Sequence, residues 1–246
     1  MHIRNIRLFN FKNYEEETAE FSPGLNCLVG NNGAGKTNLL DAIHYLSLTR
    51  SAFSAIDKDQ VRHAEEAFLV QGTFVHKDGK QEEVRITYHR NTGKQVLVDG
   101  SGHERLSDHI GRFPVVLIAP NDTDLVREGS EGRRKFFDAI LSQADPAYLQ
   151  NLITYYKYLK QRNALLKLFG ERRYFDRQQL EIYTEKLVSL GDGIHAQRRE
   201  FLKEYTELFK EQYMWISEDK EDTDITYVSE ARGGMADLME ERLEKD

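Results

Sequence analysis

The chain has 246 residues, a length that suits one globular lobe with a large appendage or two small domains. Its net charge is −7, its hydrophobic share is 39% and its charged share is 30%, a balance typical of a soluble protein with long exposed helices. No apolar run approaches the roughly 18 residues of a membrane span, and the first residues lead into a strand-like segment rather than a signal peptide, so we expect a cytoplasmic protein.

The first third of the chain predicts strands, then a glycine-rich loop, then a helix. Residues 3–11 and 18–21 have the composition of two strands joined by a turn. Residues 25–29 form a mostly apolar run, which predicts a buried strand containing Cys27 as a small buried side chain. From Asn38 onward apolar residues recur at helical spacing. We therefore expect strand, loop and helix in direct succession.

The loop matches the phosphate-binding pattern G-x-x-x-x-G-K-[ST] at every defined position. Its glycines can adopt positive φ and let backbone N–H groups face an anion, while the helix N-terminus adds partial positive charge. Lys36 would neutralise the β- and γ-phosphates of ATP, and the Thr37 hydroxyl would ligate Mg²⁺. A chance match on a surface turn is the alternative, which both flanking segments disfavour. The predicted nucleotide-binding residues are Gly30, Asn31, Asn32, Gly33, Ala34, Gly35, Lys36 and Thr37.

Further strands are predicted after the first helix. Three β-like runs cover residues 68–75, 83–88 and 95–98, and the segments between them contain the glycines of hairpin turns. Residues 115–118 are all aliphatic, which predicts another buried strand that ends before Pro120.

The second half of the chain is helical in pattern. Asp145-Pro146 is typical of a helix start, and Gly170 is a natural end for that helix. A second helix begins near Asp176, and we expect the glycines in residues 191–193 to interrupt it. Residues 236–246 have the pattern of a helix interior without a capping residue, which indicates that the sequence stops inside a longer protein.

The predicted elements divide into residues 1–144, with the phosphate-binding loop, and residues 145–246, with the helices. Residues 154–177 hold 7 Lys and Arg against 2 acids, interleaved with tyrosines. Residues 217–246 hold 11 acids against 4 bases, so the excess negative charge is confined to this tail. The basic stretch could follow a phosphate backbone, and a solvated helix face is the alternative.

Two other classes of phosphate-loop protein fit less well. Small-molecule kinases usually carry the loop after their first strand, whereas several strand-like segments precede it here. A GTPase would carry the base-reading sequence Asn-Lys-x-Asp, which this chain lacks. No run of four apolar residues followed by an acid gives a convincing Walker B segment.

Two blocks of sequence carry a more specific pattern. The first joins residues 10–14 to the loop, its helix and residues 49–51. The second contains Pro120-x-Asp122, Leu125-Val126 and Arg133-Arg134-x-Phe136-x-Asp138. Together they resemble the RecF family, bacterial DNA-repair ATPases of the ABC/SMC-type group.

The resemblance implies an α/β fold, the N-terminal half of an ABC-type P-loop ATPase head with a mixed sheet and a β meander, followed by a helical arm lobe. It implies an ATP-dependent DNA-binding protein of replication, recombination and repair, which binds double-stranded DNA near single-strand gaps and helps RecA loading with RecO and RecR. Two heads would close as an ATP-dependent homodimer. Hydrolysis would need a signature motif and a Walker B acid beyond Asp246, so we expect none from this chain. Another SMC-like or OLD-like P-loop ATPase, acting as a structural clamp, is the alternative.

The resemblance also implies roles outside the loop. Lys12 and Asn13 would lie near the nucleotide, with a solvated strand end as the alternative. Asp122 would sense Mg²⁺ or the γ-phosphate, or else form a turn. Arg133 and Arg134 would contact DNA or make intramolecular ion pairs. The candidate DNA contacts on the basic stretch are Lys157, Lys160, Arg172 and Arg173.

Overall fold

A computed structural model describes residues 1–127, 129–231 and 233–243. The chain divides into two compact units, Met1–Arg133 and Arg134–Asp246. The sequence pattern predicted this boundary at residue 144. The difference concerns α3 (Ser130–Ala144), most of which lies in the second unit.

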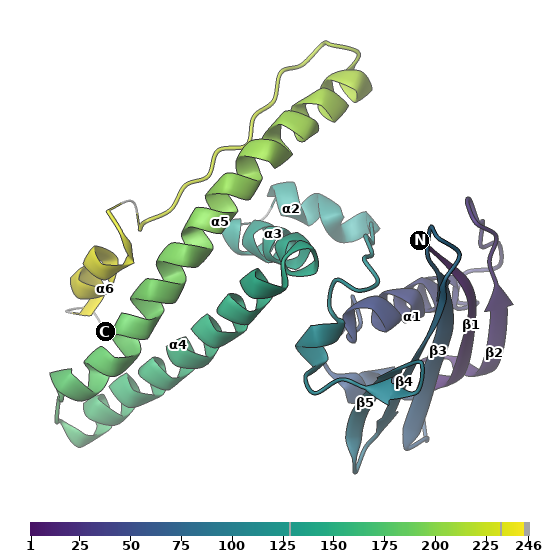
Figure 1. The fold of residues 1–246 in the computed structure, drawn as a ribbon, viewed down its shortest axis with the longest axis horizontal. Helices are drawn as coiled ribbons and strands as arrows, with labels where there is room; N and C mark the ends of the chain where they lie inside the picture. The colour runs from purple at the N-terminus through teal and green to yellow at the C-terminus, as the bar shows by residue number, and fades with distance from the viewer. Residues whose placement is uncertain (128, 232, 244–246) are drawn as a thin grey trace. The chain divides into compact units, whose positions relative to one another are not determined.

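Among the described residues of the first unit, six strands form one sheet in the order β2-β1-β3-β4-β5-β6 (Figure 1). Every pairing in it is antiparallel, because short turns join most consecutive strands. The α/β architecture is confirmed, although the sheet is antiparallel rather than mixed. The strands are β1 (His2–Phe11), β2 (Tyr14–Glu20), β3 (Ala67–Val75), β4 (Gln81–His89), β5 (Gly93–Val98) and β6 (Ser101–Gly102).

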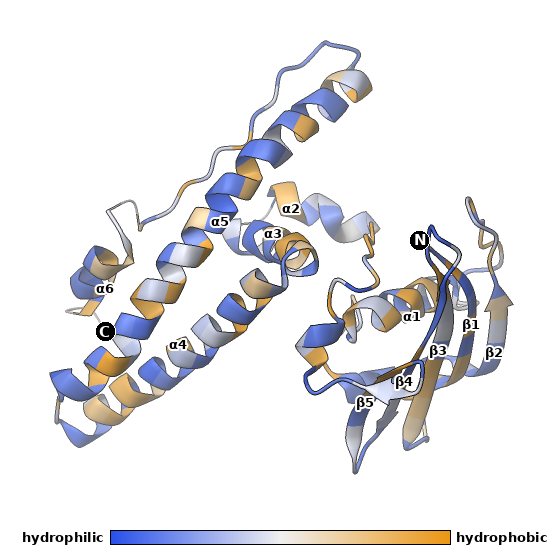
Figure 2. Ribbon diagram, viewed as in Figure 1, coloured by the Kyte–Doolittle hydropathy of each residue, from blue (hydrophilic) through white to orange (hydrophobic). Residues whose placement is uncertain are grey.

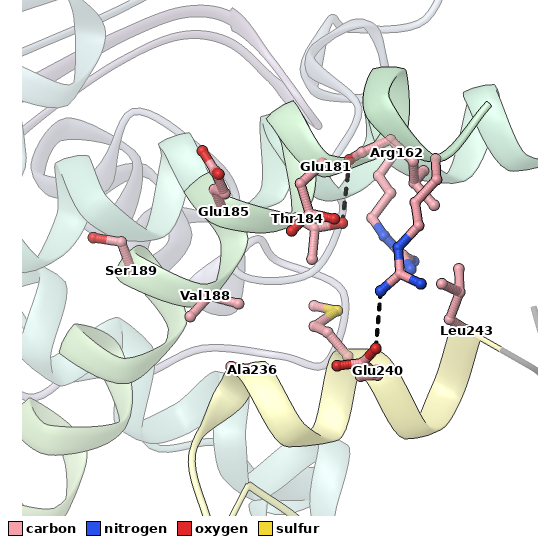
Figure 3. Close-up of a pocket in the computed structure, with 12 residues that line it drawn as sticks. Arg162, Glu181, Thr184, Glu185, Val188, Ser189, Ala236, Glu240 and Leu243 are labelled. Atoms are coloured by element: carbon pink, nitrogen blue, oxygen red, sulfur yellow. Dashed lines mark hydrogen bonds and ion pairs between the residues drawn. The ribbon is translucent and has the colours of Figure 1, made fainter.

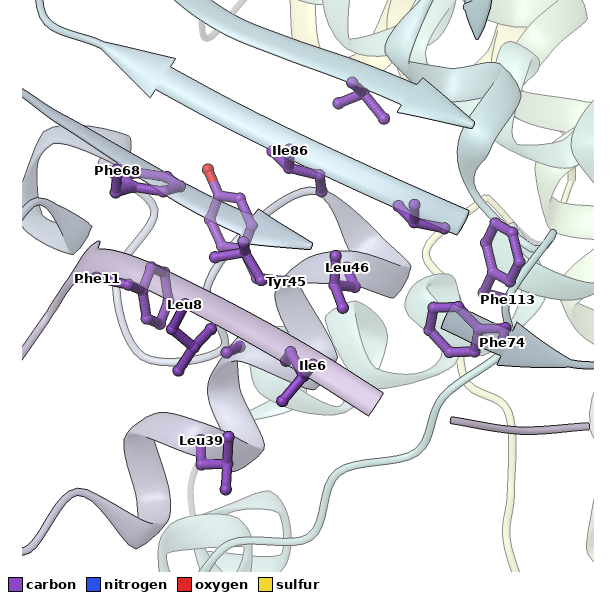
Figure 4. Close-up of a cluster of buried hydrophobic side chains, with 14 of the residues drawn as sticks. Ile6, Leu8, Phe11, Leu39, Tyr45, Leu46, Phe68, Phe74, Ile86 and Phe113 are labelled. Carbon is purple, nitrogen blue, oxygen red and sulfur yellow. The ribbon is translucent and has the colours of Figure 1, made fainter. Parts of the chain in front are cut away.

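The helix α1 (Lys36–Leu48) covers one face of this sheet and closes the core of the first unit (Figure 4). Strand residues alternate between buried and partly exposed, as a half-covered sheet requires. Tyr45 and Leu46 of the helix are fully buried against the strands. Gly72 lets the helix approach, because a Cβ there would lie 2.6 Å from the Cδ1 atom of Leu46.

Two predicted buried strands are wrong. Residues 25–29 and 115–118 form no strand, and Cys27 is exposed. The exposed fraction is 93% for Val29 and 84% for Ile118. Apolar composition favours a strand only where a neighbouring strand and a covering layer are present, and these segments lie outside the sheet.

Short helical turns complete the first unit, and a buried carboxylate lies at the start of β4. Glu82 accepts hydrogen bonds from Arg112 at 2.7 Å and from Lys80 at 2.9 Å, and its other oxygen lies 2.7 Å from Nε2 of His76. The Arg112 hydrogen bond, opposed by burial and aided by Lys80 and His76, lowers the pKa of Glu82 to about 2. The turns are η1 (Asp57–Gln60), η2 (Leu106–His109), η3 (Pro120–Thr123) and α2 (Asp124–Arg127).

The second unit is helical, and α4 (Pro146–Arg172) and α5 (Arg177–Ser217) form a long hairpin (Figure 1). Hydrophilic and hydrophobic residues alternate along both helices, as expected for helices that pack along one face (Figure 2). The predicted cap is confirmed, since Asp145 Oδ1 accepts a hydrogen bond from the Ala147 N–H at 2.8 Å. No helix within the described residues is both long and apolar enough to span a membrane.

Glycines do not end or interrupt these helices where the sequence predicted. The helix α4 continues past Gly170 to Arg172. The helix α5 runs unbroken through residues 191–193, and Gly191 leaves room for α6 (Met235–Leu243) to pack against it. A Cβ on Gly191 would lie 2.6 Å from the Cε atom of Met235. The predicted terminal helix is confirmed to Leu243, and residues 244–246 lie outside the described residues.

A buried polar cluster joins three helices of the second unit. Asp138 of α3 accepts hydrogen bonds from Arg198 of α5 at 2.8 and 2.7 Å, and from the Tyr148 hydroxyl of α4 at 2.5 Å. Although burial disfavours its charge, the hydrogen bonds to Asp138 raise the pKa of Arg198. Burial and then the bond to Asp138 raise the pKa of Tyr148. Asp138, which belongs to the sequence block of residues 120–138, therefore holds three helices together, a role that the sequence did not predict.

Candidate nucleotide-binding site

The backbone of the loop at residues 30–37 turns at two glycines. Gly33 has φ 83° and Gly35 has φ 104°, both in the left-handed region that favours glycine. Gly35 is the N-cap of α1, so Lys36 and Thr37 begin the helix and lie where its partial positive charge is concentrated. The predicted loop and the helix after it are confirmed, although no strand leads directly into the loop.

The Lys36 side chain folds back over this loop. Its ammonium group donates hydrogen bonds to the carbonyl oxygens of Gly30 at 2.7 Å and Asn31 at 2.8 Å. The ammonium is therefore held among the loop's peptide groups. Thr37 is exposed in the first turn of the helix, so its hydroxyl is accessible to a metal ion. An ammonium, a hydroxyl and two glycines of positive φ fit a Mg²⁺-bound triphosphate.

The turn between β1 and β2 contacts the end of the loop. Tyr14 donates a hydrogen bond from its hydroxyl to the Gly35 carbonyl oxygen at 3.1 Å. Asn38 donates to the Asn13 side-chain oxygen at 2.7 Å. A Cβ on Gly35 would lie 2.7 Å from the Asn13 Nδ2 atom and 2.8 Å from the Tyr14 hydroxyl. Asn13 therefore lies beside the loop, and its contact with nucleotide stays a prediction.

Lys12 lies in the same turn but its side chain is engaged elsewhere. Its ammonium forms a 2.5 Å ion pair with Asp41 of α1, and both side chains are largely buried. Asp41 also accepts hydrogen bonds from the Ser51 hydroxyl at 2.6 Å and the Ala52 N–H at 2.7 Å. This network fixes α1 to the β1–β2 turn. A nucleotide contact by Lys12 stays a prediction.

Asp122 and Arg133 both make local contacts in the first unit. Asp122 accepts a hydrogen bond from the Ala119 N–H at 2.8 Å, as an acid does when it stabilises a turn. Its role near Mg²⁺ stays a prediction. Arg133 donates to the Leu125 carbonyl oxygen at 2.9 Å, which ties the start of α3 to α2.

The other candidate DNA contacts lie on the helical unit. Arg134 lies beside a cavity of about 210 Å³ that Tyr155 and Arg198 also line. Lys157 and Lys160 are exposed on α4. A second cavity of about 340 Å³ lies between α5 and α6, and the ion pair of Arg177 with Glu240 lies beside it (Figure 3). The remaining candidates, both exposed, are Arg172 and Arg173 at the end of α4.

Comparison with known proteins identifies the family. Residues 2–233 match the family model described as AAA domain. The DNA replication and repair protein RecF of Phocaeicola vulgatus is 42% identical over 247 aligned positions, which cover all of this chain and 66% of that protein. The protein of the same name from Flavobacterium johnsoniae is 38% identical, and the aligned region covers 68% of it.

Solved structures agree with the sequence comparison. A structure of the recombination mediator protein RecF-ATPrS in the RecFOR pathway has a TM-score of 0.88 to this chain at 32% identity, over 99% of this chain and 66% of that one. A RecF-ATP structure gives a TM-score of 0.87 at 30% identity. The chain spans about two thirds of the length of these relatives. With the phosphate-binding loop and the whole-chain similarity in agreement, the chain belongs to the RecF family.

Proposed function

We propose that this chain binds Mg²⁺-ATP at Gly30–Thr37. The observation that carries the proposal is the position of the Lys36 ammonium over the loop carbonyls, beside Gly33 and Gly35 and the N-terminus of α1. The loop N–H groups and Lys36 would hold the phosphates, and Thr37 would hold the metal ion. Bound Mg²⁺ would supply further charge neutralisation at the phosphates. RecF relatives with ATP support the choice of nucleotide.

The metal assignment can be tested with Thr37→Val, which keeps the shape of the side chain and removes the hydroxyl. We expect it to weaken binding of a fluorescent ATP analogue in Mg²⁺ and to leave binding in EDTA close to that of the wild type. The matched control is Thr87→Val, on the opposite face of the sheet from α1. A Thr37→Val variant that keeps the full Mg²⁺ enhancement would rule out this ligand.

We further propose that the protein acts in the cytoplasm on double-stranded DNA near single-strand gaps. In this proposal it pairs two ATP-bound heads as a homodimer and helps RecA loading with RecO and RecR. Family membership and the name of the similar recombination mediator in the RecFOR pathway support this role. The exposed Lys157 and Lys160 on α4 supply charge for phosphate contacts.

The DNA role is tested by measuring duplex affinity across a salt series, with and without ATP. We expect ATP to strengthen binding, because pairing two heads doubles the phosphate contacts. Lys157→Glu/Lys160→Glu should weaken binding to all sequences and reduce the salt slope by about 2, or about 1 for each lost phosphate contact. The charge-matched control is Lys186→Glu/Lys203→Glu on α5. Binding indifferent to ATP, salt and these lysines would favour the structural clamp with a protein partner.

A further inference from the structure

The turn between α4 and α5 presents two aromatic side chains to solvent. The exposed fraction is 59% for Tyr174 and 52% for Phe175. Both rings pack edge-on against the buried ring of Phe169, with centroid distances of 6.1 and 5.5 Å. Each ring is therefore anchored on one side by α4 while another part remains accessible.

Helix caps fix the turn that carries these rings. Arg173 is in the left-handed region with φ 51°, and the Tyr174 N–H donates to the Phe169 carbonyl oxygen at 3.2 Å. Asp176 caps α5 by accepting from the Gln179 N–H at 3.0 Å. The aromatic pair sits on a fixed turn, so little conformational entropy is lost when the rings are covered.

The charge around the turn is positive and available. Arg177 is held by Glu240 at 2.9 Å (Figure 3). Arg172 and Arg173 are exposed, and their side chains make no ion pair or hydrogen bond within the described residues. Two exposed arginines next to two aromatic rings form a surface that complements a phosphate and a base.

A candidate phosphate contact lies further back along α4. Lys157 and Arg172 lie on one face of the helix at about 100° per residue, and 15 residues at 1.5 Å each separate them by about 22 Å. This distance corresponds to six or seven base pairs at about 3.4 Å each. A duplex that follows the exposed face of α4 would bring its end to Tyr174 and Phe175.

We propose that Tyr174 and Phe175 stack on an unpaired base where a DNA duplex meets a single-stranded gap, while Arg172 and Arg173 contact the adjoining phosphates. This inference rests on the proposed DNA-binding function. It assigns the recognition of gapped DNA to the turn between α4 and α5. Intact duplex buries both faces of each internal base in its stack, whereas the first unpaired base at a gap can offer its face to a ring. Stacking accepts any base, so the preference for gaps would carry no sequence preference.

The decisive variant is Tyr174→Leu/Phe175→Leu, which keeps apolar contact with Phe169 and removes both aromatic faces. We expect its affinity for gapped DNA to fall about tenfold while its affinity for intact duplex stays nearly unchanged. The exchange variant Tyr174→Phe/Phe175→Tyr keeps two rings and should retain the gap preference. Trp215→Leu, which removes an exposed ring at the other end of α5, is the matched control.

A second readout places 2-aminopurine at the first unpaired position of the gapped DNA. The wild type and the exchange variant should quench its fluorescence by stacking, and the leucine variant should not. Equal gap preference and quenching in the leucine variant would overturn the inference while leaving the DNA-binding function intact. A wild type without salt-dependent DNA binding would overturn the proposed function and this inference together.

Discussion

The ammonium nitrogen of Lys36 lies 2.7 Å from the carbonyl oxygen of Gly30, at the other end of the phosphate-binding loop. A second hydrogen bond, to the Asn31 carbonyl oxygen, holds the same ammonium at 2.8 Å. An arriving triphosphate would replace these neutral acceptors with charged oxygens, to which an ammonium is attracted more strongly. The carbonyl groups of the loop thus position the lysine over the loop.

Lys36→Ala is expected to lower the affinity for Mg²⁺-ATP by about 10- to 100-fold, the equivalent of one lost hydrogen bond to a charged group. Titration of a fluorescent ATP analogue measures this change. The control Lys77→Ala removes an exposed lysine from the turn between β3 and β4 and should bind as the wild type does. Equal affinities for the two variants would contradict the assignment of Lys36.

Gly35→Ala is expected to lower the melting temperature of the nucleotide-free protein more than Gly33→Ala does. Both glycines have positive φ, so an alanine at either costs about 1–2 kcal/mol of backbone strain. Only at Gly35 would the new Cβ also collide with Asn13 and Tyr14, whereas the space around Gly33 is open. Thermal unfolding followed by circular dichroism separates the two effects. A larger loss for Gly33→Ala would mean that the β1–β2 turn does not constrain the loop.

The sequence predicted those parts of the fold that short-range chemistry determines. The loop at residues 30–37 carries its own glycines and lysine. Asp145 caps the helix that begins at the next residue. The hairpins from β3 to β5 follow from turn residues between alternating runs. Each of these features depends on a few consecutive residues, so a pattern in the sequence was sufficient.

Features that depend on distant contacts were missed. The ion pair of Lys12 with Asp41 and the salt bridge of Asp138 with Arg198 join separate elements, and no spacing rule identifies such partners. Gly191 lies inside a helix, and Met235, far away in the sequence, fills the space that a side chain there would occupy. Residues 25–29 have the composition of a buried strand but lie outside the sheet. Burial and pairing are tertiary properties, which local composition does not determine.

Asp138→Ala is expected to destabilise the helical unit by about 3 kcal/mol, because it leaves the largely buried Arg198 guanidinium without its carboxylate. Tyr148→Phe removes one hydrogen bond to the same carboxylate and should cost about 1 kcal/mol. Urea unfolding measures both changes. Glu200→Ala, which breaks an exposed pair with Lys203, is the control and should change stability little. Equal losses for Asp138→Ala and Glu200→Ala would show that the buried pair does not hold the helices together.

The stability of the first unit should fall in acid because of Glu82. Its pKa is lowered from 4.5 to about 2 in the folded protein, mainly by the hydrogen bond from Arg112. A depressed carboxyl pKa contributes stability that is fully present above the unfolded value of 4.5 and is lost as the pH falls towards 2. The free energy of unfolding, measured in urea across this range, should therefore decrease steadily as the pH is lowered from 4.5 to 2.

Glu82→Gln isolates this contribution, because the amide keeps the shape of the side chain and cannot ionise. The variant should be less stable at neutral pH, where Arg112 loses a charged partner, and its stability should depend less on pH between 4.5 and 2. Glu83→Gln, one residue along β4 and facing the opposite side of the sheet, is the matched control and should keep the wild-type pH dependence. If Glu82→Gln loses stability in acid as steeply as the wild type does, the acid sensitivity arises from other carboxylates.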